Sequence, residues 1–331
     1  MPPVRALSAD DLVVVTGGAG FIGSHIVCEL AEAGLRVVIS DLFRSGDKWR
    51  NVAAAPLYDI VRPEMLPEWL NRHGDRLAAI IHMGAISATT ETDVDRFVVN
   101  NIRLTLDLWE WCATNATRFI YASSAATYGN GGAGFTDDQS PAALATLRPL
   151  NAYGWSKHVV DRRIIDDAVS GRLQPPQWVG LKFFNVYGPN ENHKGDMQSV
   201  VGKIYPVVKD GGTVQLFKSH NPQYRDGGQL RDFVYVKDCV GVVRWLLENP
   251  TISGLFNVGT GMARSFLDLV TAVGEAVGRA PNIRFVDTPA GIRSNYQYFT
   301  QADLAKLRTA GFDLPFHSLE DGVRDYVQSI R

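Results

Sequence analysis

The feature that most constrains this chain is an apolar run that breaks into glycines near its start. Residues 12–15 are Leu-Val-Val-Val, a pattern typical of a buried parallel strand, and a helical pattern runs from 21 to about 33. Between them, Gly17, Gly20 and Gly23 fit a G-x-x-G-x-x-G spacing. Glycine allows a tight turn and lets the backbone approach a pyrophosphate, which the start of the next helix would attract. The stretch therefore predicts a dinucleotide-binding site.

The next strand pattern leads to an acidic residue at the position that such a site needs. The run Val37–Ile39 is followed by Asp41, about 20 residues after the glycines, where a carboxylate would bind a ribose hydroxyl. Two cations, Arg44 and Lys48, come next. They could bind the 2′-phosphate of NADP, or they could be ordinary solvated loop charges. The sequence leaves these two interpretations about equal.

The composition is that of a globular protein and excludes several classes of partner. Of the 331 residues, 45% are hydrophobic and 21% are charged, and the net charge of −2 gives no field that would attract nucleic acid or an anionic membrane. No run approaches the roughly 18 apolar residues of a membrane span, and residues 1–5 lack the apolar core of a secretion signal. The 3 cysteines are far apart, and neither they nor the 7 histidines have metal-ligand spacing. We therefore predict a cytoplasmic protein without a metal site.

The alternation of strand and helix patterns predicts the fold class. Strand patterns at 78–82, 118–122 and 178–184 alternate with helical patterns at 64–74, 93–113 and about 150–169, and the polar stretch 129–148 is predicted to be an active-site loop. Beyond 184 the elements are shorter, including strand 232–236 and helix 239–248. This predicts an α/β fold, a Rossmann doubly wound parallel sheet with a smaller, discontinuous α/β C-terminal lobe. The expected NADP-binding Rossmann domain covers 1–184 plus about 232–262 and 297–308, and the expected substrate-binding domain covers 185–231 plus about 263–296 and 309–331.

A tyrosine and a lysine one helical turn apart are the candidate proton-transfer pair. Tyr153 and Lys157 lie in a predicted helix, so both side chains reach the same face. The ammonium would favour the phenolate, lowering the pKa of Tyr153 towards neutrality, and could also donate to the nicotinamide ribose. Ser124, which follows the strand pattern 118–122, could hydrogen-bond the reacting oxygen. A Tyr-x-x-x-Lys pair alone is common on helix surfaces, but together with the glycine stretch it favours a catalytic role.

These motifs resemble those of a known superfamily. Residues 16–23, Ser124 and Tyr153-x-x-x-Lys157 are similar to the extended short-chain dehydrogenase/reductases, which modify nucleotide sugars with a tightly held nicotinamide cofactor. Within that superfamily, the chain from about residue 11 onward resembles the ADP-glyceromanno-heptose 6-epimerases of the NAD-dependent epimerase/dehydratase family. The segments that carry this closer resemblance are 121–129, 184–189, 193–195 (His-Lys-Gly), 231–236 and 296–304.

The resemblance implies a reaction and the residues that perform it. Epimerisation at C6 of an ADP-heptose, a step towards the lipopolysaccharide core, would oxidise a secondary alcohol to a ketone and return the hydride to the opposite face. NADP is the implied cofactor, with NAD as the alternative. Tyr153 and Lys194 would share the proton transfers, one for each epimer, assisted by Ser124 and Lys157. Lys194 would then be desolvated or close to another cation, because an exposed lysine is too basic; the alternative is a solvated loop lysine.

The resemblance also implies contact positions. The cofactor positions are Gly17, Gly20, Phe21, Ile22, Gly23, Asp41, Leu42, Lys48, Met83, Gly84, Ala85, Ser87, Asn100, Tyr153, Lys157, Val186 and Lys194. The substrate positions are Ser124, Asn185, Asp196, Lys203, Phe217, Arg231 and Tyr296. Arg231 would bind the diphosphate, unless it pairs with an adjacent acid. The chain departs from the family pattern at Met83, where an acid is usual, and in longer segments at 129–149 and 218–230 that border the expected substrate cleft.

Three other functions fit parts of the pattern. A nucleotide-sugar 4-epimerase would use Tyr153 alone and tolerate the loss of Lys194. A 4,6-dehydratase would need an Asp-Glu pair after Ser124, where this chain has Ala125 and Ala126. A catalytically silent cofactor-binding protein would lack part of the Tyr/Lys set, which is complete here. The resemblance further implies a homo-oligomer, with an ADP-heptose or a related nucleotide sugar as its small-molecule partner.

Overall fold

A parallel sheet forms the larger part of the molecule. The computed structural model describes residues 7–289, 293 and 296–330. Two predictions fall partly or wholly outside the described residues. One is the absence of a secretion signal at 1–5, and the other is the part of the expected substrate-binding domain at 290–292, 294–295 and 331. Within the described chain the sheet has seven strands, in the spatial order β10 (Gly254–Val258), β6 (Trp178–Phe183), β5 (Arg118–Ser124), β4 (Leu77–His82), β1 (Leu12–Thr16), β2 (Arg36–Ser40) and β3 (Leu57–Val61). All neighbouring pairs in it are parallel. The predicted α/β fold with a Rossmann sheet is therefore confirmed.

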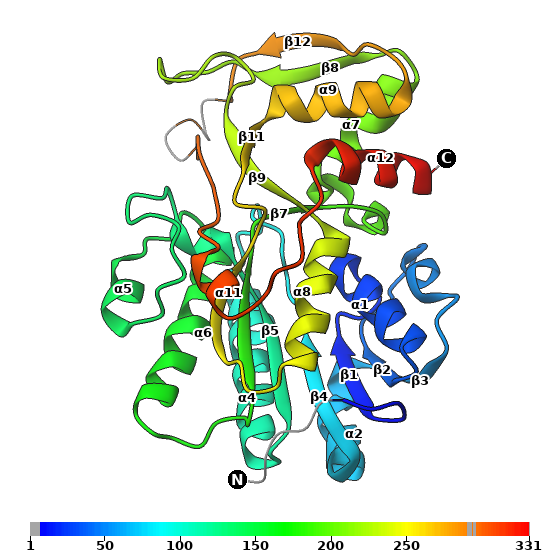
Figure 1. Cartoon of the computed structure of the whole chain (residues 1–331), viewed down its shortest axis with the longest axis vertical. Helices are drawn as coiled ribbons and strands as arrows, with labels where there is room; N and C mark the ends of the chain where they lie inside the picture. The colour runs from blue at the N-terminus through cyan, green and yellow to red at the C-terminus, as the bar shows by residue number, and fades with distance from the viewer. Residues whose placement is uncertain (1–6, 290–292, 294–295, 331) are drawn as a thin grey trace.

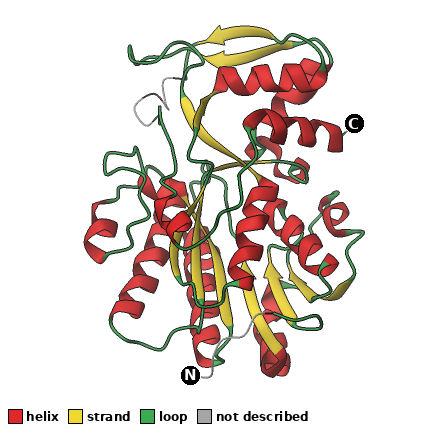
Figure 2. Ribbon diagram, in the orientation of Figure 1, coloured by secondary structure: helices red, strands yellow, loops and turns green. Residues whose placement is uncertain are grey.

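Helices cover both faces of this sheet because its central strands are apolar on both sides. In β1, Leu12 and Val14 belong to a core cluster with α2 (Leu66–His73), α4 (Leu104–Thr114) and α6 (Ala152–Val169). Val13 and Val15 belong to a second cluster with α1 (Phe21–Glu32), α8 (Val236–Glu248) and α11 (Ala305–Thr309). Figure 2 shows these helices on the two sides of the strands. The helical segments around the sheet are α1 (Phe21–Glu32), η1 (Lys48–Val52), η2 (Pro63–Met65), α2 (Leu66–His73), η3 (Gly74–Arg76), α3 (Val94–Phe97), η4 (Val98–Arg103), α4 (Leu104–Thr114), η5 (Ala125–Tyr128), α5 (Pro141–Thr146), α6 (Ala152–Val169), α8 (Val236–Glu248) and α11 (Ala305–Thr309).

A smaller lobe lies beyond the carboxyl ends of the large sheet (Figure 1). The chain enters it at the end of β6, which is followed directly by the first strand of this lobe. Its elements are β7 (Asn185–Tyr187), η6 (Asn192–Met197), α7 (Val200–Lys209), β8 (Thr213–Phe217), β9 (Leu230–Tyr235), β11 (Ala263–Ser265), α9 (Phe266–Val277), β12 (Asn282–Val286) and α12 (Leu319–Ser329). Strand β9 pairs with β7 in parallel and with β11 antiparallel, and β8 pairs with β12 in parallel. The apolar faces of α7, α9 and α12 form the core of this lobe. The carboxyl ends of the large sheet thus face a second layer, where open α/β sheets bind ligands.

Several elements differ from the predicted ones, for local reasons. No strand was predicted at β3, whose three central residues are exposed at the edge of the sheet. The helix predicted over 93–113 is divided by η4, a π-helical segment. The predicted loop 129–148 contains α5, whose N-terminus is capped by Ser140. The strand predicted at 232–236 begins at Leu230, and the helix predicted from 239 begins at Val236.

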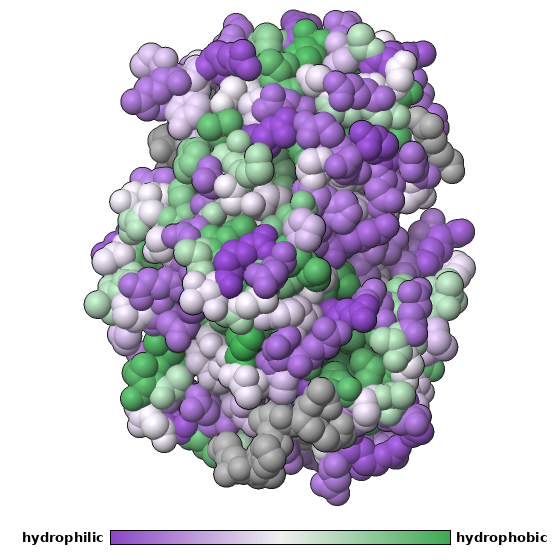
Figure 3. Space-filling model, in the orientation of Figure 1, coloured by the Kyte–Doolittle hydropathy of each residue, from purple (hydrophilic) through white to green (hydrophobic). Residues whose placement is uncertain are grey.

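Cysteine and histidine side chains are dispersed through the fold. Cys28, Cys112 and Cys239 are free thiols. Within the described ranges, no group of three or more His, Cys, Asp or Glu side chains could hold a metal ion. In the same part of the chain, every helix is too short or too polar to cross a bilayer. Figure 3 shows polar and apolar side chains interspersed over one face of the molecule.

Candidate active site

The loop between β1 and α1 has the shape that a pyrophosphate-binding turn requires. Gly17 has a φ of 63°, and a Cβ there would lie 2.7 Å from Gly84 Cα. A Cβ on Gly23 would lie 2.1 Å from the Gly17 carbonyl oxygen, so glycine lets α1 start close to the loop. Helix α1 begins at Phe21 without a side-chain cap, which leaves its first N–H groups and positive dipole end available to an anion. This cradle fits the phosphates of a dinucleotide.

Replacing Gly23 by alanine tests the cradle. The added Cβ must push α1 away from the loop, so we expect binding of a dinucleotide, assayed with both NAD and NADP, to weaken at least about tenfold, or ~1.4 kcal/mol. Gly241→Ala is the matched control: it lies within α8, no heavy atom lies within 4 Å of the added Cβ, and the change should be neutral or slightly stabilising. Titration calorimetry and thermal melting of both variants give the comparison. If Gly23→Ala bound the dinucleotide as tightly as the unaltered protein, the role of the glycine would be contradicted.

Asp41 follows β2 and is held by donors from the protein itself. Its Oδ2 accepts from the Ala19 N–H at 2.9 Å, and its Oδ1 accepts from the Leu42 N–H at 2.6 Å and from Lys48 Nζ at 2.5 Å. Lys48 also donates to the Leu42 carbonyl oxygen at 3.2 Å. Arg44 lines the same cleft and has a φ of 53°. The region just after β2 therefore presents a carboxylate neutralised by one cation, with a second cation nearby.

A buried hydrogen-bond chain that the sequence analysis missed holds the turn after β4. The Thr16 hydroxyl accepts from the Gly84 N–H at 3.1 Å and lies 2.6 Å from His82 Nδ1. His82 Nε2 lies 2.9 Å from Thr105 Oγ1, and the Thr105 hydroxyl donates to the Asn101 carbonyl oxygen at 2.6 Å. Thr105 must therefore accept from His82 Nε2–H, which leaves Nδ1 to accept from Thr16. A neutral His82 with this tautomer fixes the turn that begins at Gly84.

Asn101 ties the same turn to the neighbouring helices. Its side chain accepts from the Ile86 N–H at 2.8 Å, donates to the Ile86 carbonyl oxygen at 2.9 Å and donates to Ser156 Oγ at 3.1 Å. Asn100, the predicted cofactor position, lines the cleft and donates to the Arg96 carbonyl oxygen at 2.8 Å. Both asparagines belong to the π-helical segment η4, a type of irregularity that is frequent at functional sites.

The pH dependence of stability tests the neutral state of His82. Burial, with a smaller contribution from the Lys157 charge, lowers the pKa of His82 from 6.5 to about 3. The unfolded chain takes up a proton below pH 6.5 and the folded one does not, so this stability is fully present above pH 6.5 and is lost as the pH falls towards 3. We expect a loss of about 2 kcal/mol between pH 7.5 and pH 5 from this residue. Urea unfolding at both values should show a smaller loss for His82→Gln, which has no titratable ring; an equal loss would contradict the assignment.

Ser124, Tyr153 and Lys157 meet where β5 ends against α6. A Cβ on Gly154 would lie 2.6 Å from a backbone oxygen of η5, so the helix packs closely against the turn that follows Ser124. A hydrogen bond joins the hydroxyl groups of Ser124 and Tyr153. The Lys157 ammonium donates to the Ala122 carbonyl oxygen at 2.7 Å. The structure therefore brings the three predicted residues to one edge of the cleft.

The pKa of Tyr153 differs from the predicted one. Burial raises the pKa of Tyr153, the hydrogen bond with Ser124 lowers it, and the charge of Asp161 raises it. The Lys157 ammonium donates to the Ala122 carbonyl oxygen, and burial lowers the pKa of Lys157 itself to about 8. The prediction of a Tyr153 pKa near neutrality is thus wrong for this arrangement. The neighbouring charge that acts on both groups is Asp161.

Lys194 reaches the same cleft from the smaller lobe. It lies in η6 just before Gly195, whose φ is 52°, and its N–H donates to the Glu191 carbonyl oxygen at 2.9 Å. The side chain is half-buried, and Nζ lies 5.0 Å from the centroid of the Phe21 ring. Burial lowers the pKa of Lys194, the Glu191 carboxylate raises it, and Lys203 lowers it. The prediction that Lys194 is desolvated or close to another cation is confirmed.

One cleft of about 1110 Å³ is lined by residues of both lobes. All the predicted cofactor positions line it, and so do Ser124 and Asn185 of the substrate set. Its size exceeds the roughly 300–1,000 Å³ of an ordinary ligand pocket and suits a cofactor together with a substrate. Polar side chains on its wall that were not predicted as contacts include Ser40, Arg96, Gln198 and Ser199.

The other predicted substrate positions lie in the smaller lobe and do not line this cleft. The Arg231 guanidinium carbon lies 5.7 Å from the centroid of the Tyr296 ring, and the Phe217 and Tyr296 ring centroids are 6.1 Å apart. These three residues therefore form one cluster. Asp196 and Lys203 are exposed on η6 and α7.

Arg231 does not make the alternative ion pair with its neighbour. Its guanidinium donates to the Leu230 carbonyl oxygen at 2.8 Å and to the Gln297 carbonyl oxygen, and burial lowers its pKa. The Asp232 carboxylate accepts instead from Thr260 and from the N–H groups of Gly261 and Ala302. The buried Arg231 guanidinium is thus bound to backbone carbonyl oxygens and not to the neighbouring carboxylate.

The family model of the NAD dependent epimerase/dehydratase family matches residues 13–259, which include the glycine loop, Ser124, Tyr153, Lys157 and Lys194. The chain belongs to this family. Binding of NAD(P) is a property of the family, which agrees with the cradle between β1 and α1.

Known proteins similar to this chain cover nearly all of it. The ADP-L-glycero-D-manno-heptose-6-epimerase of Fusobacterium nucleatum subsp. nucleatum is 48% identical over 96% of this chain and 97% of its own. A protein of the same name from Nitratidesulfovibrio vulgaris is 49% identical over the same shares. The crystal structure of the Helicobacter pylori ADP-L-glycero-D-manno-heptose-6-epimerase matches with a TM-score of 0.81 at 28% identity, covering 97% of this chain and 96% of that one.

Proposed function

We propose that this chain inverts C6 of an ADP-heptose, converting ADP-D-glycero-D-manno-heptose to ADP-L-glycero-D-manno-heptose, a step towards the lipopolysaccharide core. The observation that carries the proposal is that Tyr153 of α6 and Lys194 of η6, two candidate proton carriers from different lobes, line one cleft. A 4-epimerase would need Tyr153 alone. A half-buried Lys194 with a lowered pKa therefore favours the 6-epimerase. Relatives that bear this name and are 48% and 49% identical support it.

The residues of the chain would move protons and hold the ligands. When bound at the glycine cradle, the nicotinamide cofactor would supply the reversible hydride transfer that inversion of the sugar carbon needs. Tyr153, hydrogen-bonded to Ser124, would exchange a proton with the hydroxyl of one epimer. Lys194, whose amine lies over the Phe21 ring, would serve the other epimer, because the two hydroxyl groups point in different directions. Lys157 would bind the nicotinamide ribose.

The remaining contacts are proposals of the same kind. The cradle at Gly17–Gly23 would hold the cofactor pyrophosphate, and Asn185 would contact the sugar. Arg231 would bind the diphosphate, with the Phe217 and Tyr296 rings beside it. The division into two domains and the homo-oligomer remain predictions.

A panel of nucleotide sugars tests the function. The protein is incubated with ADP-D-glycero-D-manno-heptose, a UDP-hexose and a dTDP-hexose, and the configuration at each carbon is followed by NMR. We expect inversion at C6 of the ADP-heptose. Reactions that start from either epimer should reach the same equilibrium mixture of the two epimers. Inversion at C4 of a hexose with an inert heptose would establish the 4-epimerase instead, and no change in any sugar would favour the silent protein.

We further propose NADP as the cofactor. Asp41, the acid that would bind a free ribose hydroxyl in an NAD site, already accepts from Ala19, Leu42 and Lys48, and Arg44 adds a second cation. We therefore expect the purified protein to release NADP when it is denatured, measured by mass spectrometry of the supernatant. Arg44→Ser should raise the proportion of NAD that is bound. Release of NAD from the unaltered protein would contradict the proposed role of the two cations.

A further inference from the structure

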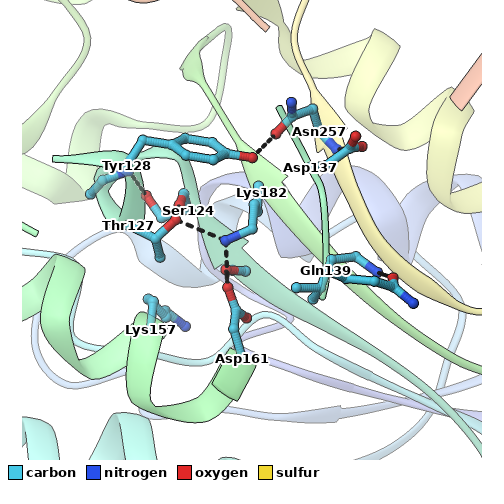
Figure 4. Close-up of polar contacts among 12 residues, drawn as sticks. Ser124, Thr127, Tyr128, Asp137, Gln139, Lys157, Asp161, Lys182 and Asn257 are labelled. Carbon is cyan, nitrogen blue, oxygen red and sulfur yellow. Dashed lines mark hydrogen bonds and ion pairs between the residues drawn. The ribbon is translucent and has the colours of Figure 1, made fainter. Parts of the chain in front are cut away.

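A buried ion pair lies beside the proton-transfer residues and takes no part in the scheme above. Lys182, in the otherwise apolar strand β6, places Nζ 2.6 Å from Asp161 Oδ2 of α6, and the two side chains are 1% and 0% exposed. Figure 4 shows Asp161 directed at Lys182, with Lys157 on the same helix. A buried pair of this kind is seldom more stabilising than apolar side chains of the same shape. Its presence here therefore needs another explanation.

Both members of the pair are hydrogen-bonded to the strand and turn that carry Ser124. Asp161 Oδ2 also accepts from the Ser123 hydroxyl at 2.7 Å. Lys182 Nζ donates to Thr127 Oγ1 at 2.8 Å, and the Thr127 hydroxyl donates to the Ser124 carbonyl oxygen at 2.8 Å (Figure 4). The pair thus links α6, which carries Tyr153, to the backbone of Ser124.

The charge of Asp161 also acts on the two proton-transfer groups. It raises the pKa of Tyr153, and it opposes the lowering of the Lys157 pKa by burial. Lys182 compensates that charge at 2.6 Å. Other titratable or charged groups surround the Asp161–Lys182 pair. They are Tyr153, Lys157 and His158 from α6, Tyr121 from β5, Tyr128 from η5 with Asp137 beside it, His82 from β4 and Lys306 from α11.

We propose that Asp161 and Lys182 are positioning residues of the reaction, which anchor the turn at Ser124 and balance the charge beside Tyr153 and Lys157. The identity of the substrate rests on the proposed function, but the effect on Tyr153 rests on the geometry alone. Without Lys182, the unpaired Asp161 carboxylate would favour the neutral phenol of Tyr153. Without the charge of Asp161, the Lys182 ammonium would favour the phenolate. The two changes should therefore shift the titration of Tyr153 in opposite directions, which a general loss of packing would not do.

Phenolate absorbance measures this titration without substrate. The ultraviolet difference between each variant and the same variant carrying Tyr153→Phe isolates the Tyr153 hydroxyl. We expect Lys182→Met to raise the midpoint by about one pH unit or more, Asp161→Asn to lower it by a similar amount, and the double variant to stay within about half a unit of the parent. In the holoenzyme, kcat at neutral pH should fall about tenfold for each unit by which Lys182→Met raises the midpoint.

Controls separate positioning from folding and from the choice of substrate. Lys182→Arg keeps the cation and should restore the parent titration, and Arg163→Met, which breaks a 3.2 Å pair with Asp167 on the same helix, should change nothing. If a single variant does not fold, the double variant, which has no unpaired buried charge, still decides: a midpoint displaced by more than about one unit overturns the proposal. Shifts of the same sign in both single variants also overturn it. Opposed shifts in a protein that inverts no ADP-heptose would refute the proposed function and leave the positioning role standing.

Discussion

Replacement of Lys194 by methionine is expected to slow inversion at C6 by about a hundredfold to ten-thousandfold, the usual contribution of a general acid or base. The side chain lines the cleft opposite α6, is half-buried over the Phe21 ring and has a lowered pKa, so its amine is suited to transfer a proton. Methionine has a side chain of similar length but no amine that could give up or accept a proton. NADP affinity should change little. NMR of the sugar, started from each epimer, measures the rate, and calorimetry measures the cofactor.

Two further lysine variants separate proton transfer from charge. Lys194→Arg keeps the cation, but a guanidinium does not give up its proton. This variant should therefore invert C6 nearly as slowly as Lys194→Met does. Lys209→Met removes an exposed cation at the end of α7 and should invert C6 at the normal rate. Normal inversion at C6 by Lys194→Met in both directions would exclude the two-residue scheme.

The large sheet could be predicted from the sequence because its central strands are buried on both faces. Strands β1, β4, β5 and β6 are almost entirely buried and mostly apolar, so each can be recognised without knowledge of its partners. Strand β3 lies at an edge with exposed Tyr58 and Ile60, and β7 and β11 have three residues each. Such strands exist because of tertiary pairing, which local patterns do not contain.

The residues that surround the site were less predictable than those that line it. Gly23, Tyr153 and Lys157 belong to motifs with fixed spacing, whereas His82 and Asn101 act through partners distant in the sequence. Lys182 did carry a signal, because a lysine in the middle of an apolar strand needs a buried partner. Finding Asp161 as that partner required the tertiary packing of α6 against the sheet. Burial raises the pKa of Tyr153, and burial too depends on tertiary packing, so the predicted pKa near neutrality was wrong.

The second large effect is expected for Tyr153→Phe, which should slow inversion at C6 at least about a hundredfold while the protein folds and binds its ligands. Phenylalanine keeps the ring, whose centroid lies 6.5 Å from that of Phe97, so the packing of α6 against α3 is retained. It removes the hydroxyl that is hydrogen-bonded to Ser124. The free energy of unfolding should change by no more than about 1.5 kcal/mol, the net value of one hydrogen bond. Urea unfolding, calorimetry with NADP and NMR of the sugar measure the three quantities.

The comparison of this variant with Lys194→Met is more informative than either alone. If each residue serves the hydroxyl of one epimer, then inversion in either direction needs both, and the two variants should be slow to a similar extent from either epimer. If Tyr153 acts alone, its loss abolishes inversion while Lys194→Met remains active. Tyr58→Phe, a change on the exposed edge strand β3, should match the unaltered protein in every measurement. Full activity of Tyr153→Phe would place the proton transfer elsewhere on the cleft wall, and the nearest candidate hydroxyl would then be that of Ser124 itself.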